Sequence, residues 1–509
     1  MTNPIDECLS ERDGRLYIEE LDATALLMRF GSPLFVFSED QLRRNVRRFQ
    51  RSFSQGWDCG PVTVMPAVKA NWAQAIQAVL ADEGCGADIY SEGELEVALR
   101  VGIDPAQMSV NGVPKSLDHI DRALEVGARI TVDSLRDVDI LEDLTCDGAR
   151  SGRVALRLRP TVSDFNRPSG FVPQGLAPTD LVALMYKGGL STDEAIEAGR
   201  RIADMRGLSI VGFHQHHGRH HPSTDLWSAQ MRAYGREIGR VSRALGNLRP
   251  QEIDIGGGFA IPRDPHNAAT DYLAPLQLGA LYAVSWGLKA LGRAVRYRLL
   301  RPLLSLASDQ PNQRAAPSIE DYAAATTRAL RDTLDAEGLS LDGVRLQLEP
   351  GRSIHGNAGV HLASVQALKS MDAPVPWRHV VIDTSEFWLA GGRFEHHLHD
   401  YVVANKMNAP IAQHADVTGR SCYGDRLLGR VPLPELEVGD VLALLDTGAY
   451  QEVSASNFNA MARPASILVN GEEAHVIRRA ETMDDVFRRD RVPEHLRPKG
   501  RAPGDRAAE

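Results

Sequence analysis

The chain has 509 residues, which corresponds to two or three domains of ordinary size. Hydrophobic residues make up 43% and charged residues 24%, a globular composition that excludes disordered, collagen-like and disulfide-scaffold chains. The formal net charge of −10 argues against general nucleic-acid binding.

The cysteines and the N-terminus predict a cytoplasmic protein. The cysteines are widely spaced and form no CxxC pair, so they suggest neither a zinc site nor a disulfide framework. The first residues, MTNPIDECLSERDG, are acidic and polar, unlike a signal peptide. Residues 272–288 carry no charge, but the stretch is short for a bilayer and contains Pro275, so a membrane span is disfavoured. The cysteines are Cys8, Cys59, Cys85, Cys146 and Cys422.

Short apolar runs alternate with segments of helical periodicity along most of the chain. Segments 92–102 and 117–127 are expected helices, and Ser191 with Glu194 forms a candidate capping box. Eight strands alternating with helices predict an α/β fold, a (β/α)8 TIM barrel, with a doubly wound open sheet as the alternative. The apolar runs are 62–70, 87–90, 108–111, 129–132, 154–160, 210–216, 252–258 and 345–350.

The barrel is predicted over residues 34–365, and a β-rich domain over 366–485. The runs VVID, VLALLD and ASILVN, with turn residues between them, predict the strands of the second domain. Residues 1–33 have no barrel partner and are expected to join it, whereas 486–509 is expected to be a flexible tail. An insertion at about 265–317 has a basic centre, which suits an extra rim helix, a lid, or a partner-binding or membrane-surface helix.

The unusual residues fall at the ends of predicted strands, where barrel enzymes place their chemistry. Lys69 ends the first run among apolar neighbours, which predicts a lowered pKa and a Schiff-base nucleophile, or else a buried ion pair. His214 and His216 alternate on the sixth run, so His217 faces away from both. No acidic or cysteine residue lies near them, so we expect a stacking imidazole and no metal.

Two further strand ends complete the pattern. Gly256, Gly257 and Gly258 can form a phosphate nest or merely a loop. Glu349 can pair with a protonated ring nitrogen and Arg352 with a phosphate, although the two could also form a surface turn. A lysine, an imidazole, a phosphate nest and an acid together meet the requirements of pyridoxal 5′-phosphate (PLP).

With these motifs the sequence resembles the fold-type III PLP-dependent decarboxylases, the group that contains diaminopimelate decarboxylase and eukaryotic-type ornithine decarboxylase. The resemblance covers about residues 30–470 apart from the insertion. The matching motifs are PLFVF (33–37), AVKAN (67–71), GADIYSEGELEVAL (86–99), VNGVPKS (110–116), LRLRP (156–160), KGGLSTDEA (187–195), GFHQHHG (212–218), DIGGGF (254–259), LEPGR (348–352), SCYGD (421–425), GAYQ (448–451) and FNAMARP (458–464).

The resemblance implies an alanine racemase-like barrel, a C-terminal β domain and a head-to-tail homodimer with shared sites. By matching position, Lys69 forms the Schiff base with PLP, His216 stacks on its ring, and Glu349 pairs with the pyridinium nitrogen. Asp88 and Arg157 support the lysine. The phosphate-binding set comprises Arg219, Gly256, Gly257, Gly258, Gly351, Arg352 and Tyr450.

The partner subunit is implied to complete each site. Cys422 matches the acid that reprotonates the quinonoid intermediate, and Tyr423 and Asp425 accompany it. Asp383 matches a position that can meet a distal amine, which leaves a cationic substrate side chain open. The resemblance thus implies decarboxylation of a diamino or modified α-amino acid.

The resemblance leaves alternative reactions open, and the sequence departs from the family motifs at several positions. Alanine racemases place an arginine where this chain has Glu349, so the glutamate favours decarboxylation over racemisation or epimerisation. Pro66 replaces an aromatic residue, Arg219 replaces a phosphate-binding serine, and Tyr423 replaces the glutamate of diaminopimelate decarboxylases. These departures leave the substrate open and keep a non-catalytic PLP-binding protein as a further alternative.

Overall fold

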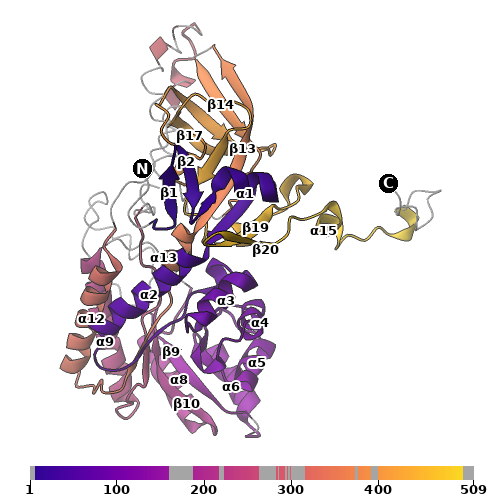
Figure 1. The fold of residues 1–509 in the computed structure, drawn as a ribbon. Helices are drawn as coiled ribbons and strands as arrows, with labels where there is room; N and C mark the ends of the chain where they lie inside the picture. Colours follow the sequence, from indigo (N-terminus) through magenta and orange to yellow (C-terminus); the bar gives the residue numbers. More distant parts are fainter. Residues whose placement is uncertain are drawn as a thin grey trace.

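The computed structural model describes residues 6–148, 150–159, 187–216, 223–262, 316–372, 376–390 and 399–496, with short pieces between 283 and 299. A barrel occupies the lower part of Figure 1 and a β-rich domain the upper part. Most of the predicted insertion and residues 497–509 of the predicted tail lie outside the described residues. Within the described ranges, no helix combines the length and apolar character that a bilayer span requires.

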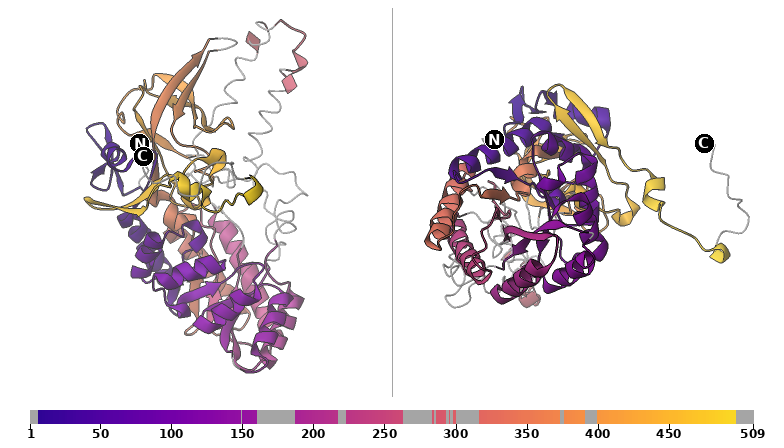
Figure 2. Two further views of the ribbon diagram at one scale, coloured as in Figure 1. Left: turned by 90° about the vertical axis from the view of Figure 1, so that its right-hand side faces the viewer. Right: turned by 90° about the horizontal axis from the view of Figure 1, so that it is seen from below.

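The eight predicted barrel strands are all present, and they pair in parallel. Seen from below in Figure 2, they form a ring inside a ring of helices, which confirms the barrel over the open sheet. The sheet runs β5-β12-β11-β10-β9-β8-β7-β6, and a parallel bridge from Ala67 to Asp88 joins its two ends. The strands are β5 (Val62–Val64), β6 (Ala87–Ile89), β7 (Met108–Val110), β8 (Arg129–Val132), β9 (Gly152–Arg157), β10 (Leu208–His214), β11 (Glu252–Asp254) and β12 (Arg345–Leu348).

Serine residues begin most of the barrel helices, because their hydroxyls accept a hydrogen bond from a free N–H of the first turn. Ser191 and Glu194 form the predicted capping box at the start of α8. The helices are α2 (Glu39–Gly56), α3 (Gln74–Asp82), α4 (Glu92–Arg100), α5 (Leu117–Val126), α6 (Leu135–Thr145), α8 (Thr192–Asp204), α9 (Thr224–Ala244) and α12 (Ile319–Ala336). The short turns are η1 (Val68–Ala70), η2 (Pro105–Gln107), α13 (Arg352–His355) and η5 (Gly356–Ala358).

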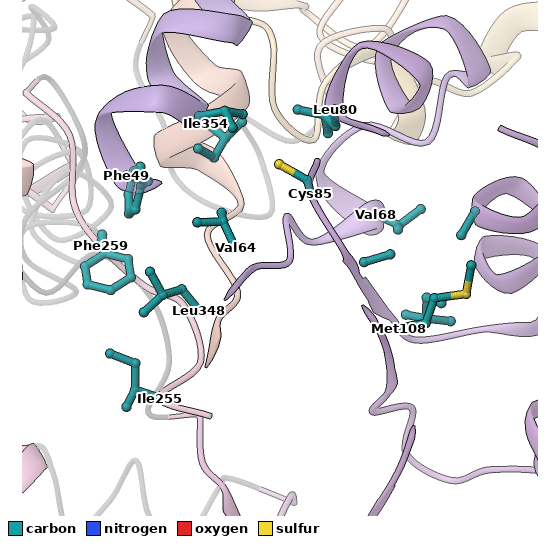
Figure 3. Close-up of a cluster of buried hydrophobic side chains, with 14 of the residues drawn as sticks. Phe49, Val64, Val68, Leu80, Cys85, Met108, Ile255, Phe259, Leu348 and Ile354 are labelled. Atoms are coloured by element: carbon teal, nitrogen blue, oxygen red, sulfur yellow. The ribbon is translucent and has the colours of Figure 1, made fainter. Parts of the chain in front are cut away.

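The barrel helices and strands share one apolar core. Figure 3 shows Phe49 of α2 beside Phe259, with Val64 and Leu348 of neighbouring strands close to them. The Phe259 ring stacks on Trp227 of α9, with 4.4 Å between centroids and 3° between planes. This packing fixes the strand ends, which hold the predicted site.

The upper domain is a nine-stranded sheet in the order β17-β16-β14-β13-β4-β19-β20, with β18 joining β13 to β15. It contains the three predicted runs as β14, β18 and β19. Its strands are β4 (Leu34–Ser38), β13 (Gly359–Met371), β14 (Trp377–Ile382), β15 (Tyr401–Val403), β16 (Gln413–Thr418), β17 (Arg426–Leu433), β18 (Val441–Leu444), β19 (Ala465–Asn470) and β20 (Glu473–Arg478). Short helical segments follow as η6 (Glu452–Ser454), η7 (Phe458–Ala460), α15 (Met483–Phe487) and η8 (Glu494–Leu496).

The sheet begins earlier than the domain boundaries expected from the sequence, because β4 and the first half of β13 belong to it. β4 pairs with β13 and β19, and all five of its residues are buried. The N-terminal segment packs on the same sheet. Its elements are β1 (Leu9–Arg12), β2 (Arg15–Ile18), β3 (Leu21–Asp22) and α1 (Ala23–Phe30). The backbone N–H of Leu16 there donates to the carbonyl of Ala404 at 2.7 Å.

Candidate active site

Lys69 lies in η1, which follows β5, and its ammonium group is 3.4 Å from Asp88 Oδ2 in β6. Its side chain is 42% exposed, but that surface faces a cavity in the protein. Burial lowers the pKa of Lys69, but the negative charges of Asp88 and Glu349 raise it further, so the net pKa lies above its ordinary value. The prediction of a lowered pKa for Lys69, which rested on its apolar neighbours in the sequence, is therefore wrong for the protein without PLP.

The cavity beside Lys69 has a volume of about 260 Å³ and lies at the C-terminal ends of the barrel strands. Five of the predicted site residues line it, and the described lining residues all come from the barrel. They are Lys69, Asp88, Tyr90, Asn111, Val113, Arg157, Lys187, Gly188, His214, His216 and Glu349.

One amide group connects the two acidic residues of the cavity. Asn111 Nδ2 donates to Asp88 Oδ1 at 2.7 Å and to Glu349 Oε1 at 2.5 Å. The other carboxylate oxygen of Glu349 lies 3.2 Å from His214 Nε2. Burial and the nearby charge of Asp88 raise the pKa of Glu349 to about 8. The cavity thus holds more buried negative charge than Lys69 alone neutralises.

A buried arginine beneath the cavity carries a second layer of the network. Arg129 of β8 is 1% exposed and donates to Asp254 at 2.8 Å and to Glu252 at 3.1 Å. It also contacts Ser109, whose hydroxyl donates to Asn111 Oδ1 at 2.8 Å. Burial and the charge of Glu349 raise the pKa of Asp254 to about 7. Arg129 therefore supports the amide that holds Glu349.

His214, Asp254 and Glu349 have potential ligand atoms within 4.8 Å of one another, which is close enough for a metal ion. Burial lowers the pKa of His214 to about 3, so its imidazole is neutral. The two carboxylates already accept hydrogen bonds from Arg129 and Asn111. We therefore interpret the trio as support for the cavity wall.

The His216 imidazole is oriented by the glycine turn that follows β11. The N–H of Gly257 donates to His216 Nδ1 at 3.3 Å, and that of Gly256 donates to Asp254 Oδ1 at 3.0 Å. A Cβ atom on Gly257 would lie 2.1 Å from the carbonyl oxygen of Glu349, so only glycine fits there. The φ angles of Gly256 and Gly258, +70° and +102°, also require glycine.

Tyr450 and Arg352 lie next to the lysine segment. The N–H of Tyr450 donates to the Ala70 carbonyl at 2.8 Å, and the Arg352 guanidinium is 5.4 Å from the centre of the Tyr450 ring. A Cβ atom on Gly351 would lie 2.4 Å from the Tyr450 hydroxyl, so glycine permits this close packing. The structure therefore brings the predicted phosphate residues Gly351 and Arg352, which follow β12, together with Tyr450 of the β domain.

Arg157 is fixed at the cavity wall by a chain of acidic residues. It donates to Asp133 Oδ1 at 2.9 Å, and the Gly189 N–H donates to the same oxygen at 2.8 Å. The Asp133 N–H in turn donates to Asp137 Oδ2, which pairs with the buried Lys115 at 2.9 Å.

The predicted site residues of the β domain are not among the described lining residues of this cavity. Cys422 and Tyr423 are exposed at the tip of the loop between β16 and β17. Asp425 accepts hydrogen bonds from the N–H groups of Glu386 and Ser421, at 2.6 and 2.7 Å. Asp383 accepts from the N–H and hydroxyl of Ser364, at 2.9 and 3.0 Å. Arg219 lies outside the described residues, as does His217.

The cavity fits PLP on the chemistry of its donor set. Lys69 points into it, and Asp88 and Glu349 form an acidic pair that a protonated ring nitrogen would neutralise. His216 supplies a flat ring at the wall, and the glycine turn allows close approach of an anion.

The comparisons with known proteins agree with this chemistry. Residues 39–277 match the family model described as pyridoxal-dependent decarboxylase, pyridoxal binding domain. The chain carries the pyridoxal-binding domain of the PLP-dependent decarboxylases. It is a PLP-dependent carboxy-lyase of the fold-type III group, and PLP is its cofactor.

Its relatives match along nearly the whole chain. A diaminopimelate decarboxylase of Pseudomonas aeruginosa is 29% identical over 94% of this chain and 98% of its own. One from Methanothermobacter thermautotrophicus is 28% identical, with 95% and 97% covered. The structure of diaminopimelate decarboxylase from M. jannaschii with L-lysine has a TM-score of 0.80 and 24% identity, with 97% and 99% covered. The lysine/ornithine decarboxylase of Vibrio vulnificus, with putrescine, has a TM-score of 0.63 and 18% identity, with 88% and 97% covered. These two structures show a shared fold.

Sequence reasoning missed Asn111 and Arg129. Asn111 ends the third predicted strand just as Lys69 ends the first, so its position was a usable signal. Arg129 begins its strand, and its partners Asp254 and Glu252 lie far away in sequence. No local pattern could have connected them.

Proposed function

We propose that this enzyme decarboxylates an α-amino acid, with Lys69 holding PLP covalently and Cys422 of a second copy supplying the proton. When bound, PLP accepts the electron pair that the departing carboxylate leaves behind. The observation that carries the proposal is the chain of contacts from Lys69 through Asp88 and Asn111 to Glu349 in one cavity.

Each cavity residue then has a defined task. Glu349 keeps the ring nitrogen protonated, Asn111 holds that carboxylate in place, and Asp88 holds the ammonium form of Lys69. His216 is proposed to lie against the ring face. The glycine turn with Gly351, Arg352 and Tyr450 is proposed to receive the phosphate group, with Arg219 as a further donor and Arg157 supporting the lysine side.

The proton donor is proposed to come from the second copy in a homodimer. Cys422 is exposed and fixed by Asn459, whose Oδ1 accepts from the Cys422 N–H at 3.0 Å and whose Nδ2 lies 3.3 Å from Sγ. The described lining of the cavity includes no residue of this loop. A thiol can give its proton to the product carbon and regain one from solvent.

A complementation experiment tests both parts of the proposal. Lys69→Ala and Cys422→Ala are each expected to release almost no CO2 from any amino acid, because each lacks one half of every site. Random subunit exchange makes about half of the dimers mixed, each with one intact site, so about a quarter of wild-type activity should return.

The readout is CO2 and amine from PLP-loaded enzyme, over a panel of amino and diamino acids. Borohydride should fix the cofactor on Lys69, with Lys406, which is half-buried and paired with Asp440, as the control position. No recovery after proven exchange would show that Lys69 and Cys422 act within one chain. Racemised amino acid without CO2 would favour the racemase alternative.

A further inference from the structure

Three aromatic rings from separate segments gather around Cys422. Phe387 stacks on Phe458, with 4.0 Å between centroids and 20° between planes, and Tyr423 meets Phe387 edge-on at 6.0 Å. Tyr423 is 61% exposed and Phe458 is 37% exposed. We call these three residues the aromatic cluster. Exposed aromatic groups of this kind mark binding surfaces.

The loop that carries the aromatic cluster has a fixed conformation. The Gly419 N–H donates to the Asp425 carbonyl at 2.7 Å, and the Arg420 N–H donates to Thr384 at 2.9 Å. Asn459, next to Phe458, bonds to Cys422 from the other side. The cluster and the thiol are therefore presented together, and a surface that receives Cys422 also receives Tyr423 and Phe458.

Two acidic residues at this end of the β domain, Asp383 and Asp425, are used internally. Both carboxylate oxygens of Asp425 accept backbone N–H groups, and both of Asp383 are bonded to Ser364. These two carboxylates are thus committed to holding the loop and the sheet. The side chains next to the thiol are therefore those of the aromatic cluster.

One side of the cavity wall carries a cation and an aromatic ring. Lys187 and Arg157 both line it, and the Lys187 ammonium donates to the Val113 carbonyl at 3.3 Å. Tyr90, whose hydroxyl donates to the same carbonyl at 2.7 Å, adds an aromatic ring to the wall. An ammonium group placed beside Lys187 would meet like charge.

We propose that the substrate carries an uncharged, aromatic or large apolar side chain, which lies against Tyr423 and Phe458 of the second copy. The proposal rests on the proposed entry of Cys422 into that copy's cavity, and it concerns the substrate class of the same site. Stacked or edge-on contact with aromatic rings is favourable for such a side chain. An ammonium group would gain only cation–π contact with these rings, because the carboxylates of Asp383 and Asp425 are already hydrogen-bonded to Ser364 and Ser421.

The first test compares substrates with the full-length, PLP-loaded enzyme. Phenylalanine, tyrosine and leucine are compared with lysine, ornithine and meso-diaminopimelate, in both enantiomers where they exist. We expect kcat/KM for CO2 release to favour the apolar set by about tenfold or more. A preference for the cationic set would overturn the proposal.

A spectroscopic titration separates this proposal from the proposed function. Amino-acid binding changes the visible absorbance of the bound cofactor, so apparent affinities can be ranked even if no CO2 is released. Absence of CO2 from every amino acid would refute the proposed decarboxylation. Tighter binding of lysine than of phenylalanine in the titration would refute the substrate class alone.

Variants of the aromatic cluster give the second test. Tyr423→Glu should lower kcat/KM for phenylalanine about tenfold and raise the ratio of lysine to phenylalanine, whereas Tyr423→Phe should keep the wild-type ratio. Phe458→Ala should raise KM for phenylalanine more than it lowers kcat. The matched control is Phe487→Ala, an exposed aromatic residue of α15 outside the cluster. An unchanged ratio in a folded Tyr423→Glu enzyme would show that the cluster does not contact the substrate.

Discussion

The barrel and the loop of the β domain hold their reactive residues in opposite ways. In the barrel, Lys69 and Glu349 lie at strand ends and are connected through buried side chains of neighbouring strands. In the loop, Cys422 is exposed, and Asp425 fixes the turn through backbone N–H groups. The described cavity residues of the barrel come together within one chain, whereas the role proposed for Cys422 requires a second copy. The two halves should therefore fail differently when they are mutated.

The largest effect is expected in the barrel half, from Glu349→Gln. The amide cannot keep the ring nitrogen protonated, so kcat should fall by about 10²-fold or more. PLP should remain bound, because Lys69 and the phosphate residues are unchanged. The readouts are kcat for CO2 release and the cofactor content after gel filtration.

The matched control is Glu252→Gln, which changes a buried carboxylate at the opposite end of the same network. Glu252 contacts Arg129 and Arg153 and does not line the cavity. We expect kcat within a few fold of wild type. A near-normal kcat in Glu349→Gln would show that the ring nitrogen is paired elsewhere.

A smaller effect is expected in the loop half, from Asp425→Ala. Without the carboxylate, the N–H groups of Ser421 and Glu386 lose their acceptor and the loop no longer fixes Cys422. Misplacement of a reacting group costs rate, so we expect about a tenfold fall in kcat with PLP affinity unchanged.

Asp425→Asn is the milder comparison, because its side-chain carbonyl keeps one acceptor and asparagine tolerates the positive φ of +46° at this position. Its kcat should lie between those of wild type and Asp425→Ala. Loss of PLP from either variant would mean that the loop also affects PLP binding in the barrel, and that the two regions do not fail differently.

The sequence could predict the barrel and its strand ends, because both follow from local patterns. Lys69, Asp88, Arg157, His216 and Glu349 were expected at the cavity, and the structure brings them there. Their exact roles stay predictions.

The properties of the site that the sequence could not predict depend on residues that are close in space but distant in the chain. The pKa of Lys69 follows Asp88 on the adjacent strand β6 rather than the apolar residues beside Lys69 in sequence. Arg129 meets its partners only once the barrel closes. Asp383 and Asp425 look like substrate ligands in a sequence, but nearby backbone and hydroxyl groups occupy them.

The smallest expected effect is on the pH dependence of the free energy of unfolding. This dependence distinguishes buried carboxylates of the barrel from carboxylates at its surface. Unfolded carboxylic acids titrate near pH 4, whereas the folded pKa is about 8 for Glu349 and about 7 for Asp254. Between pH 6.5 and 8.5 the folded protein therefore keeps protons that the unfolded chain has lost. Its free energy of unfolding should fall as the pH rises, by up to ~1.4 kcal/mol per pH unit for each such proton.

Urea unfolding of the PLP-free protein at pH 6.5, 7.5 and 8.5 measures this slope, and Glu349→Gln should reduce it above pH 7. His214, with a pKa lowered to about 3, acts only below about pH 6.5, where stability rises with pH. The control is Glu320→Gln, because Arg48 lowers the pKa of Glu320 to about 2 and its contribution changes only in acid. This variant should keep the wild-type slope. If the free energy of unfolding of Glu349→Gln depended on pH as steeply as that of the wild type, Glu349 would be ionised in the folded protein. Arg129 and Lys69 would then neutralise the buried carboxylates more fully than their burial implies.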